Sequence, residues 1–87
     1  MNKFTYTITD KDGIHARPAG MLVKEASKFS SDISIEAKGN TADAKKIFSV
    51  MSLGVKYDDE ITITANGIDE AEAMTAMESF IKDNLWL

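Results

Sequence analysis

The sequence contains no cysteine, one proline and one histidine among its 87 residues. The absence of cysteine excludes a disulfide framework, a thiolate metal site and thiol catalysis, and it fits a reducing compartment, so we expect a cytoplasmic protein. No run of apolar residues approaches the roughly 18 that a membrane span requires. Residues 1–10 lack the basic start and apolar stretch of a secretory signal. We therefore expect neither membrane insertion nor secretion.

Basic residues are also scarce. The formal net charge is −4, so the chain lacks the basic footprint that nucleic-acid phosphates require, and we expect no nucleic-acid partner. The charge is unevenly divided, because residues 1–56 carry a net +3 and residues 57–87 a net −7. Solvated surface charge explains this division more readily than a locally basic face does.

The hydrophobic fraction of 44% and the charged fraction of 28% are sufficient for one folded core. Neither a linker nor an internal repeat is visible. At this length, about half that of a typical domain, we expect a single domain over residues 1–87.

Hydrophobic periodicity predicts seven elements. A period of two indicates half-buried strands, as where Phe4, Tyr6 and Ile8 alternate with threonines. Helical spacing of apolar residues indicates amphipathic helices. The predicted strands are 4–9, 33–38, 41–44 and 60–65, and the predicted helices are 16–29, 45–53 and 69–84. Turns are expected at 10–13, Gly39-Asn40 and Asn66-Gly67. Gly54 is expected to end the short helix, and Asp69 with Glu72 to cap the last one.

This order, β-α-β-β-α-β-α, predicts an α+β open-faced sandwich in which helices cover one face of a four-stranded antiparallel sheet. The strands each have one apolar face, and the two long helices have apolar stripes that can cover it. We assign Met74, Met77 and Phe80 to the core. We also expect Leu85-Trp86-Leu87 to pack back on the domain.

The single histidine, His15, directly precedes the helix that Pro18 helps to start near Ala16. Free backbone amides and the positive end of the helix dipole converge there, and Arg17 adds a planar cation that suits phosphate oxygens. The same positive end opposes protonation of the imidazole and keeps a neutral nitrogen available as nucleophile. These residues fit a histidine that accepts a phosphoryl group, although the spacing alone fits an ordinary loop histidine somewhat better.

The sequence offers little else for catalysis. It has no second histidine, no glycine-rich nucleotide loop and no carboxylate cluster for a metal. We therefore expect neither a self-sufficient enzyme nor a cofactor.

Two motifs, Gly13-Ile14-His15-Ala16-Arg17-Pro18-Ala19 and Val50-Met51-Ser52-Leu53-Gly54, resemble the HPr family over the whole chain. HPr is the histidine-containing phosphocarrier of the bacterial phosphoenolpyruvate-dependent sugar phosphotransferase system. The resemblance implies an open-faced, four-stranded antiparallel sheet with three helices. It also implies that enzyme I phosphorylates His15 on Nδ1, that Arg17 and the Ala16 and Arg17 amides steady the phosphoryl oxygens, and that His15 passes the group to IIA domains of sugar permeases.

The resemblance further implies a docking surface around the histidine. Its residues match Ala16, Gly20, Lys24, Ser27, Ile47, Phe48, Ser49, Met51 and Ser52. The short helix cannot bury all its apolar residues, so we expect an exposed apolar patch there. We also expect Lys24, Lys28, Lys45 and Lys46 to give this side a basic character that steers acidic partners.

One position departs from the family pattern. Many members carry a kinase-regulated serine between the lysine and the apolar residue that open the short helix, and here that position is Lys46. Lysine has no hydroxyl, so we expect serine phosphorylation to be absent at this position. A cation there is also unfavourable near a helix N-terminus by some tenths of a kcal/mol.

Two alternatives remain open from the sequence. One is a specialised paralogue that serves a nitrogen-regulatory or dihydroxyacetone-kinase branch. The other is an HPr-like binding module that carries no phosphate, against which His15 and Lys46 both argue. We expect a monomer, because one face must meet two successive partners.

Overall fold

The computed structural model describes residues 2–8, 16–56 and 58–84, and for residues 16–18, 83 and 84 it describes the backbone alone. Over these ranges the chain forms four strands and three helices in the expected order. The strands are β1 (Asn2–Thr7), β2 (Asp32–Ala37), β3 (Asn40–Asp43) and β4 (Glu60–Asn66). The helices are α1 (Ala16–Ala26), α2 (Ile47–Ser52) and α3 (Glu70–Asn84). The expectation for Leu85-Trp86-Leu87 lies outside the described residues.

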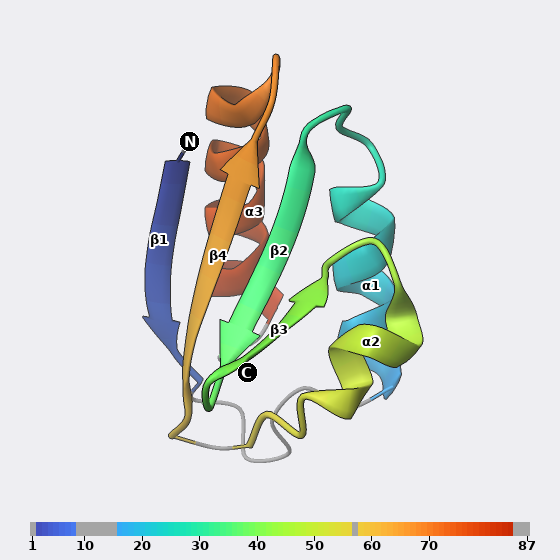
Figure 1. Cartoon of the computed structure of the whole chain (residues 1–87), viewed down its shortest axis with the longest axis vertical. Helices are drawn as coiled ribbons and strands as arrows, with labels where there is room; N and C mark the ends of the chain where they lie inside the picture. Colours follow the sequence, from blue (N-terminus) through green and yellow to red (C-terminus); the bar gives the residue numbers. More distant parts are fainter. Residues whose placement is uncertain (1, 9–15, 57, 85–87) are drawn as a thin grey trace.

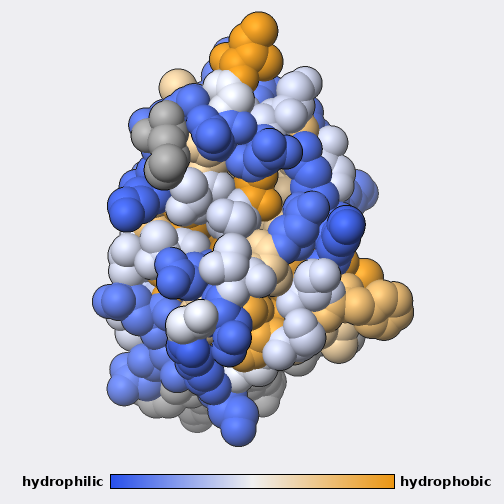
Figure 2. All heavy atoms as spheres, viewed as in Figure 1, coloured by the Kyte–Doolittle hydropathy of each residue, from blue (hydrophilic) through white to orange (hydrophobic). Residues whose placement is uncertain are grey.

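All strand pairs are antiparallel, and the sheet order is β1-β4-β2-β3. Figure 1 shows the helices on one side of this sheet, with the other side open. The open face in Figure 2 is mostly hydrophilic, because alternate residues of each strand point toward solvent. The predicted α+β open-faced sandwich is confirmed.

The core lies between the sheet and the helices. Alternation along β2 and β4 buries Ile33, Ile35, Ile61 and Ile63 completely or almost so. Met77 of α3 is fully buried, as expected, while Met74 and Phe80 pack against the core with partial exposure. The other large, fully buried apolar side chains are Ile8, Leu22, Val50 and Ile81.

The β2–β3 turn differs by one residue from the expected Gly39-Asn40. Lys38 and Gly39 both have positive φ, 56° and 82°, and Asn40 opens β3 opposite Ala37. Positive φ at both central residues is typical of the two-residue turn whose twist matches a hairpin. The observed register places Glu36 opposite Thr41. A turn one residue later would have placed Glu36 opposite the carboxylate of Asp43, a repulsive cross-strand pair.

Helix α1 is shorter than expected, since it ends at Ala26 rather than continuing to Phe29. The Phe29 amide donates to the Ala26 carbonyl at 3.3 Å, in a tighter turn that leaves the helix. The Phe29 carbonyl in turn accepts a hydrogen bond from Lys45 Nζ at 2.8 Å. A residue of the segment between β3 and α2 therefore satisfies a carbonyl of the turn that follows α1.

Asp69 does not cap α3 in the expected way. Its carboxylate accepts the amides of Ser30 and Ser31, each at 2.8 Å, and the hydroxyl of the buried Ser31. These hydrogen bonds, the Ser31 hydroxyl first, lower the pKa of Asp69. The residue that reaches back is Glu70 rather than Glu72, since Glu70 Oε1 accepts the Gly67 amide at 3.3 Å. Asp69 thus joins the start of β2 to the start of α3.

Candidate functional site

Helix α1 begins at Ala16, as expected, so its free amides come directly after His15 in the chain. No acidic residue lies in its first turn to offset the positive end of the helix dipole. His15 itself and the side chains of Ala16, Arg17 and Pro18 lie outside the described residues. The roles assigned to these residues therefore remain predictions.

Helix α2 packs beside α1 at Gly20. A Cβ atom added to Gly20 would lie 3.6 Å from Ile47 Cδ1, an ordinary contact distance, so Ile47 of α2 lies directly beside α1 at this position. Within α2, Val50 is buried, while Ile47 is half-buried against the core. The six-residue helix cannot turn all its apolar residues inward, and this leaves Phe48 82% exposed.

Exposed apolar side chains lie on both helices. Met51 of α2 is 37% exposed and Met21 of α1 is 38% exposed. Figure 2 shows hydrophobic atoms protruding on the side where Figure 1 places α2. We call the surface formed by Met21, Lys24, Lys46, Phe48 and Met51 the α1–α2 surface. The expected apolar patch is therefore present in the structure.

The docking residues expected from the sequence lie on these two helices, with different degrees of exposure. Lys24, Ser27, Phe48, Met51 and Ser52 are exposed, whereas Gly20, Ile47 and Ser49 are half-buried. The Ser27 hydroxyl donates to the Val23 carbonyl at 2.7 Å and the Ser52 hydroxyl to the Ser49 carbonyl at 2.7 Å. Both hydroxyls therefore already have a backbone acceptor, Ser27 in the adjoining helix α1 and Ser52 within α2.

Sequence reasoning missed Met21. A signal was available, because Met21 falls outside the apolar stripe of α1 that Ala19, Leu22 and Ala26 define. A large apolar residue on the polar side of an amphipathic helix indicates an exposed contact.

Two of the four expected lysines have other partners. Lys28 Nζ pairs with Glu25 at 3.0 Å, and Lys45 Nζ donates to the Phe29 carbonyl. Among the described residues, Lys24 and Lys46 have no such ion pair or hydrogen bond through their ammonium groups. Lys46 is the N-cap of α2, with extended backbone and no side-chain capping bond. The basic character of the α1–α2 surface thus rests on these two cations.

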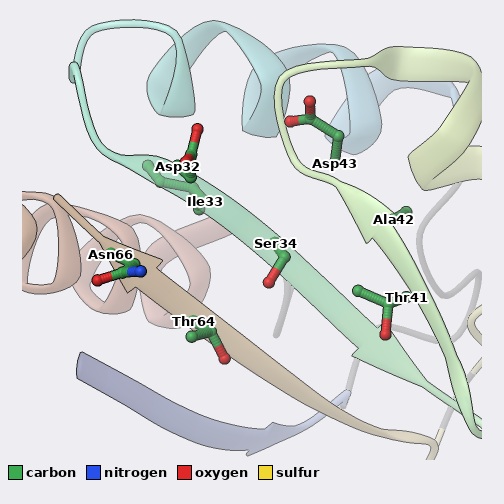
Figure 3. A pocket seen from close by; sticks show the side chains of 8 residues that line it. All are labelled: Asp32, Ile33, Ser34, Thr41, Ala42, Asp43, Thr64 and Asn66. Carbon is green, nitrogen blue, oxygen red and sulfur yellow. The ribbon is translucent and has the colours of Figure 1, made fainter. Parts of the chain in front are cut away.

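A separate hollow of about 450 Å³ lies across β2, β3 and β4. Figure 3 shows short polar side chains around it, among them Ser34, Thr41 and Thr64. None of the site residues expected from the sequence lines this hollow. No group of three or more metal-ligating side chains is present in the described part of the chain.

Comparison with known proteins identifies the family. Residues 2–83 match the family model described as the phosphorylation site of the HPr component of the phosphotransferase system. The structure of the histidine-containing phosphocarrier protein of a mycoplasma is 45% identical, with a TM-score of 0.95, and the match covers 99% of this chain and 98% of that chain.

Two further structures are similar to the chain. An HPr of Thermoanaerobacter tengcongensis is 42% identical, with a TM-score of 0.90, over 95% of this chain and 93% of that one. The catabolite-repression protein Crh of Bacillus subtilis is 35% identical, with a TM-score of 0.76, over 98% of each chain. Within the described ranges, no helix is long and apolar enough to cross a bilayer. The chain belongs to the HPr family of phosphocarrier proteins.

Proposed function

We propose that this chain is the general phosphocarrier of a sugar phosphotransferase system, which accepts a phosphoryl group from phospho-enzyme I on His15 and passes it to IIA domains. The observation that carries the proposal is the family match over residues 2–83, which includes His15 directly before the first residue of α1. That position suits the chemistry, because a helix N-terminus offers amide donors and positive potential to phosphoryl oxygens.

Arg17 would supply the charge-assisted hydrogen bonds that a transferring phosphoryl group needs. The chain brings no further catalytic group, so enzyme I and the IIA domain would each complete a transfer site around His15. Such a carrier would be phosphorylated on His15 by enzyme I and would regain its free histidine when it passes the phosphoryl group to a IIA domain.

The α1–α2 surface supports the docking role. Phe48 and Met51 of α2 and Met21 of α1 are exposed, and exposed aromatic anchors such as Phe48 dominate the energy of small interfaces. Lys24 and Lys46 would draw acidic partners to this surface. Binding should remain modest, because a carrier that binds tightly is released slowly.

The test is to incubate the protein with phosphoenolpyruvate, Mg²⁺ and enzyme I and to weigh the intact chain. We expect one acid-labile phosphate on the wild type, none on His15→Ala, and transfer of that phosphate to a IIA domain. The absence of phosphate, with enzyme I active on a standard HPr, would contradict the proposal. It would then favour a specialised branch or a phosphate-free binding module.

Crh, the similar protein of Bacillus subtilis, is described as a domain-swapped dimer. For this chain we propose a monomer in the cytoplasm, because a single α1–α2 surface has to meet enzyme I and the IIA domain in turn. Light scattering at micromolar concentration should give the mass of one chain, and a stable mass of two chains would overturn the monomer.

A further inference from the structure

Two residues other than glycine have positive φ in the described part of the chain: Lys38 at 56° and Asp58 at 74°. Left-handed backbone is unfavourable for a residue with a Cβ atom, and lysine lacks the short polar side chain that eases it for asparagine. Strain of this kind persists only where surrounding contacts hold it, and it gathers at functional sites. Both residues lie at one end of the sheet, in the β2–β3 turn and just before β4 (Figure 1).

The Lys38 side chain connects this end of the sheet to α2. Its Nζ donates to the Gly54 carbonyl at 3.0 Å and pairs with Asp59 Oδ2 at 3.1 Å. Gly54 follows α2 directly after its C-cap, with φ of 64°, and its amide donates to the Met51 carbonyl at 3.2 Å. The lysine therefore binds the carbonyl at the point where the chain leaves α2.

Asp59 is the second partner of the Lys38 ammonium group. Its carboxylate accepts the Lys56 amide at 2.8 Å as well as Lys38. These interactions, the Lys56 amide first, lower the pKa of Asp59, so the carboxylate remains charged at neutral pH. The backbone of Asp58 and Asp59 is paired with Ile8, the residue after β1. The Ile8 amide donates to the Asp59 carbonyl at 2.9 Å, and the Ile8 carbonyl accepts the Asp58 amide at 2.8 Å.

We propose that Lys38 and Asp59 are positioning residues that hold the C-terminal end of α2, and with it Phe48 and Met51, in the orientation that enzyme I engages. The inference rests on the proposed function. The two-residue hairpin turn places Lys38 in left-handed backbone, and from that position its ammonium group reaches Gly54 and Asp59 at once. Their side chains contact Gly54, Lys56 and each other, so we assign their effect to docking rather than to the transfer step.

Lys38→Gly separates positioning from stability. Glycine adopts a φ of 56° without strain, so the substitution relieves the backbone while it removes both side-chain contacts. We expect the midpoint of urea unfolding to stay the same or rise. The KM for the carrier in phosphoryl transfer from enzyme I should rise about two- to fivefold, in keeping with the loss of a partly exposed pair, with kcat unchanged.

Four further variants complete the test. Lys38→Arg keeps a long cation and should restore most of the wild-type KM. Asp59→Asn should raise the KM by a similar factor, and adding it to Lys38→Gly should cause little further loss, because the two residues act as one unit. Lys82→Ala removes a lysine that pairs with Glu78 on α3 at 3.1 Å and should leave the KM unchanged.

Hydrogen exchange measures the positioning without phosphoryl transfer. The Leu53 and Gly54 amides, which donate to Val50 and Met51, should exchange faster in Lys38→Gly, while the amides of α3 should not. The positioning role is overturned if Lys38→Gly keeps the wild-type KM, or if its KM changes only together with a loss of stability. Neither outcome contradicts the proposed carrier function. A wild-type chain that accepts no phosphate overturns the proposed function and this role together, whatever the exchange rates.

Discussion

Among single residues, Asp69 connects two distant parts of the chain through one carboxylate. Because hydrogen bonds from Ser31 and Ser30 lower its pKa from the ordinary 3.8, the contribution of Asp69 to stability is complete above pH 3.8. It is lost as the pH falls through the lower, folded-state value. We expect Asp69→Asn to unfold at lower urea than the wild type at pH 7 and pH 5. The difference between the two proteins should shrink below pH 3.8, and an undiminished difference at pH 2 would contradict this account.

Substitution by alanine is expected to have opposite effects on stability at Gly67 and at Gly20. A Cβ atom on Gly67 would lie 2.7 Å from the Cα of Ser31, so Gly67→Ala should destabilise the fold by about 1–3 kcal/mol. Among the described residues, a Cβ atom on Gly20 would meet only Ile47, at an ordinary contact distance and inside a helix. Gly20→Ala should therefore stabilise the chain by about 0.5–1 kcal/mol. Urea unfolding of both variants measures this contrast, and equal destabilisation would show that the space beside Gly20 is smaller than described.

At the scale of elements, α2 is short for the number of apolar residues that it carries. Phe48 is 82% exposed, so Phe48→Ala should change the free energy of unfolding by no more than about 0.5 kcal/mol. If Phe48 anchors the partner, the same substitution should raise the KM for transfer from enzyme I by roughly tenfold or more.

Ile68 provides the matched control for Phe48. It is 96% exposed, but it lies in the turn between β4 and α3, away from the α1–α2 surface. Ile68→Ala should leave both stability and KM close to their wild-type values. A similar rise in KM for both variants would mean that exposed apolar side chains act non-specifically.

For the whole molecule, the net charge of −4 says little about the surface that partners meet. Lys24 and Lys46 stand on that surface without an ion pair among the described residues, whereas Lys28 and Lys45 are held by Glu25 and Phe29. Lys46→Gln should lower kcat/KM about two- to threefold at low salt and flatten its salt dependence. Lys28→Gln should change kcat/KM and its salt dependence much less. Equal salt dependence for the two variants would contradict the distinction between available and paired lysines.

Much of the fold could be predicted from the chain itself. Alternation in β1, β2 and β4 and helical spacing in α1 and α3 are local properties of neighbouring residues, and the element order follows from them. The start of α1 at Ala16 was predictable for the same reason, since Pro18 and the motif around it act within one turn. Only part of the α1–α2 surface was predicted from the sequence. The exposure of Met21 and the contacts of Lys38 and Asp59 were not.

The amino-acid sequence alone determined the strands, the long helices, their order and the place of the single histidine directly before a helix. It also determined the family, because two motifs at the right separation are properties of the chain. Only the tertiary structure decided which lysines remain available, what Asp69 binds, and that the β2–β3 turn reaches the end of α2. These depend on which segments meet after folding, and contacts such as Lys45 to Phe29 or Lys38 to Gly54 leave no local pattern in the sequence.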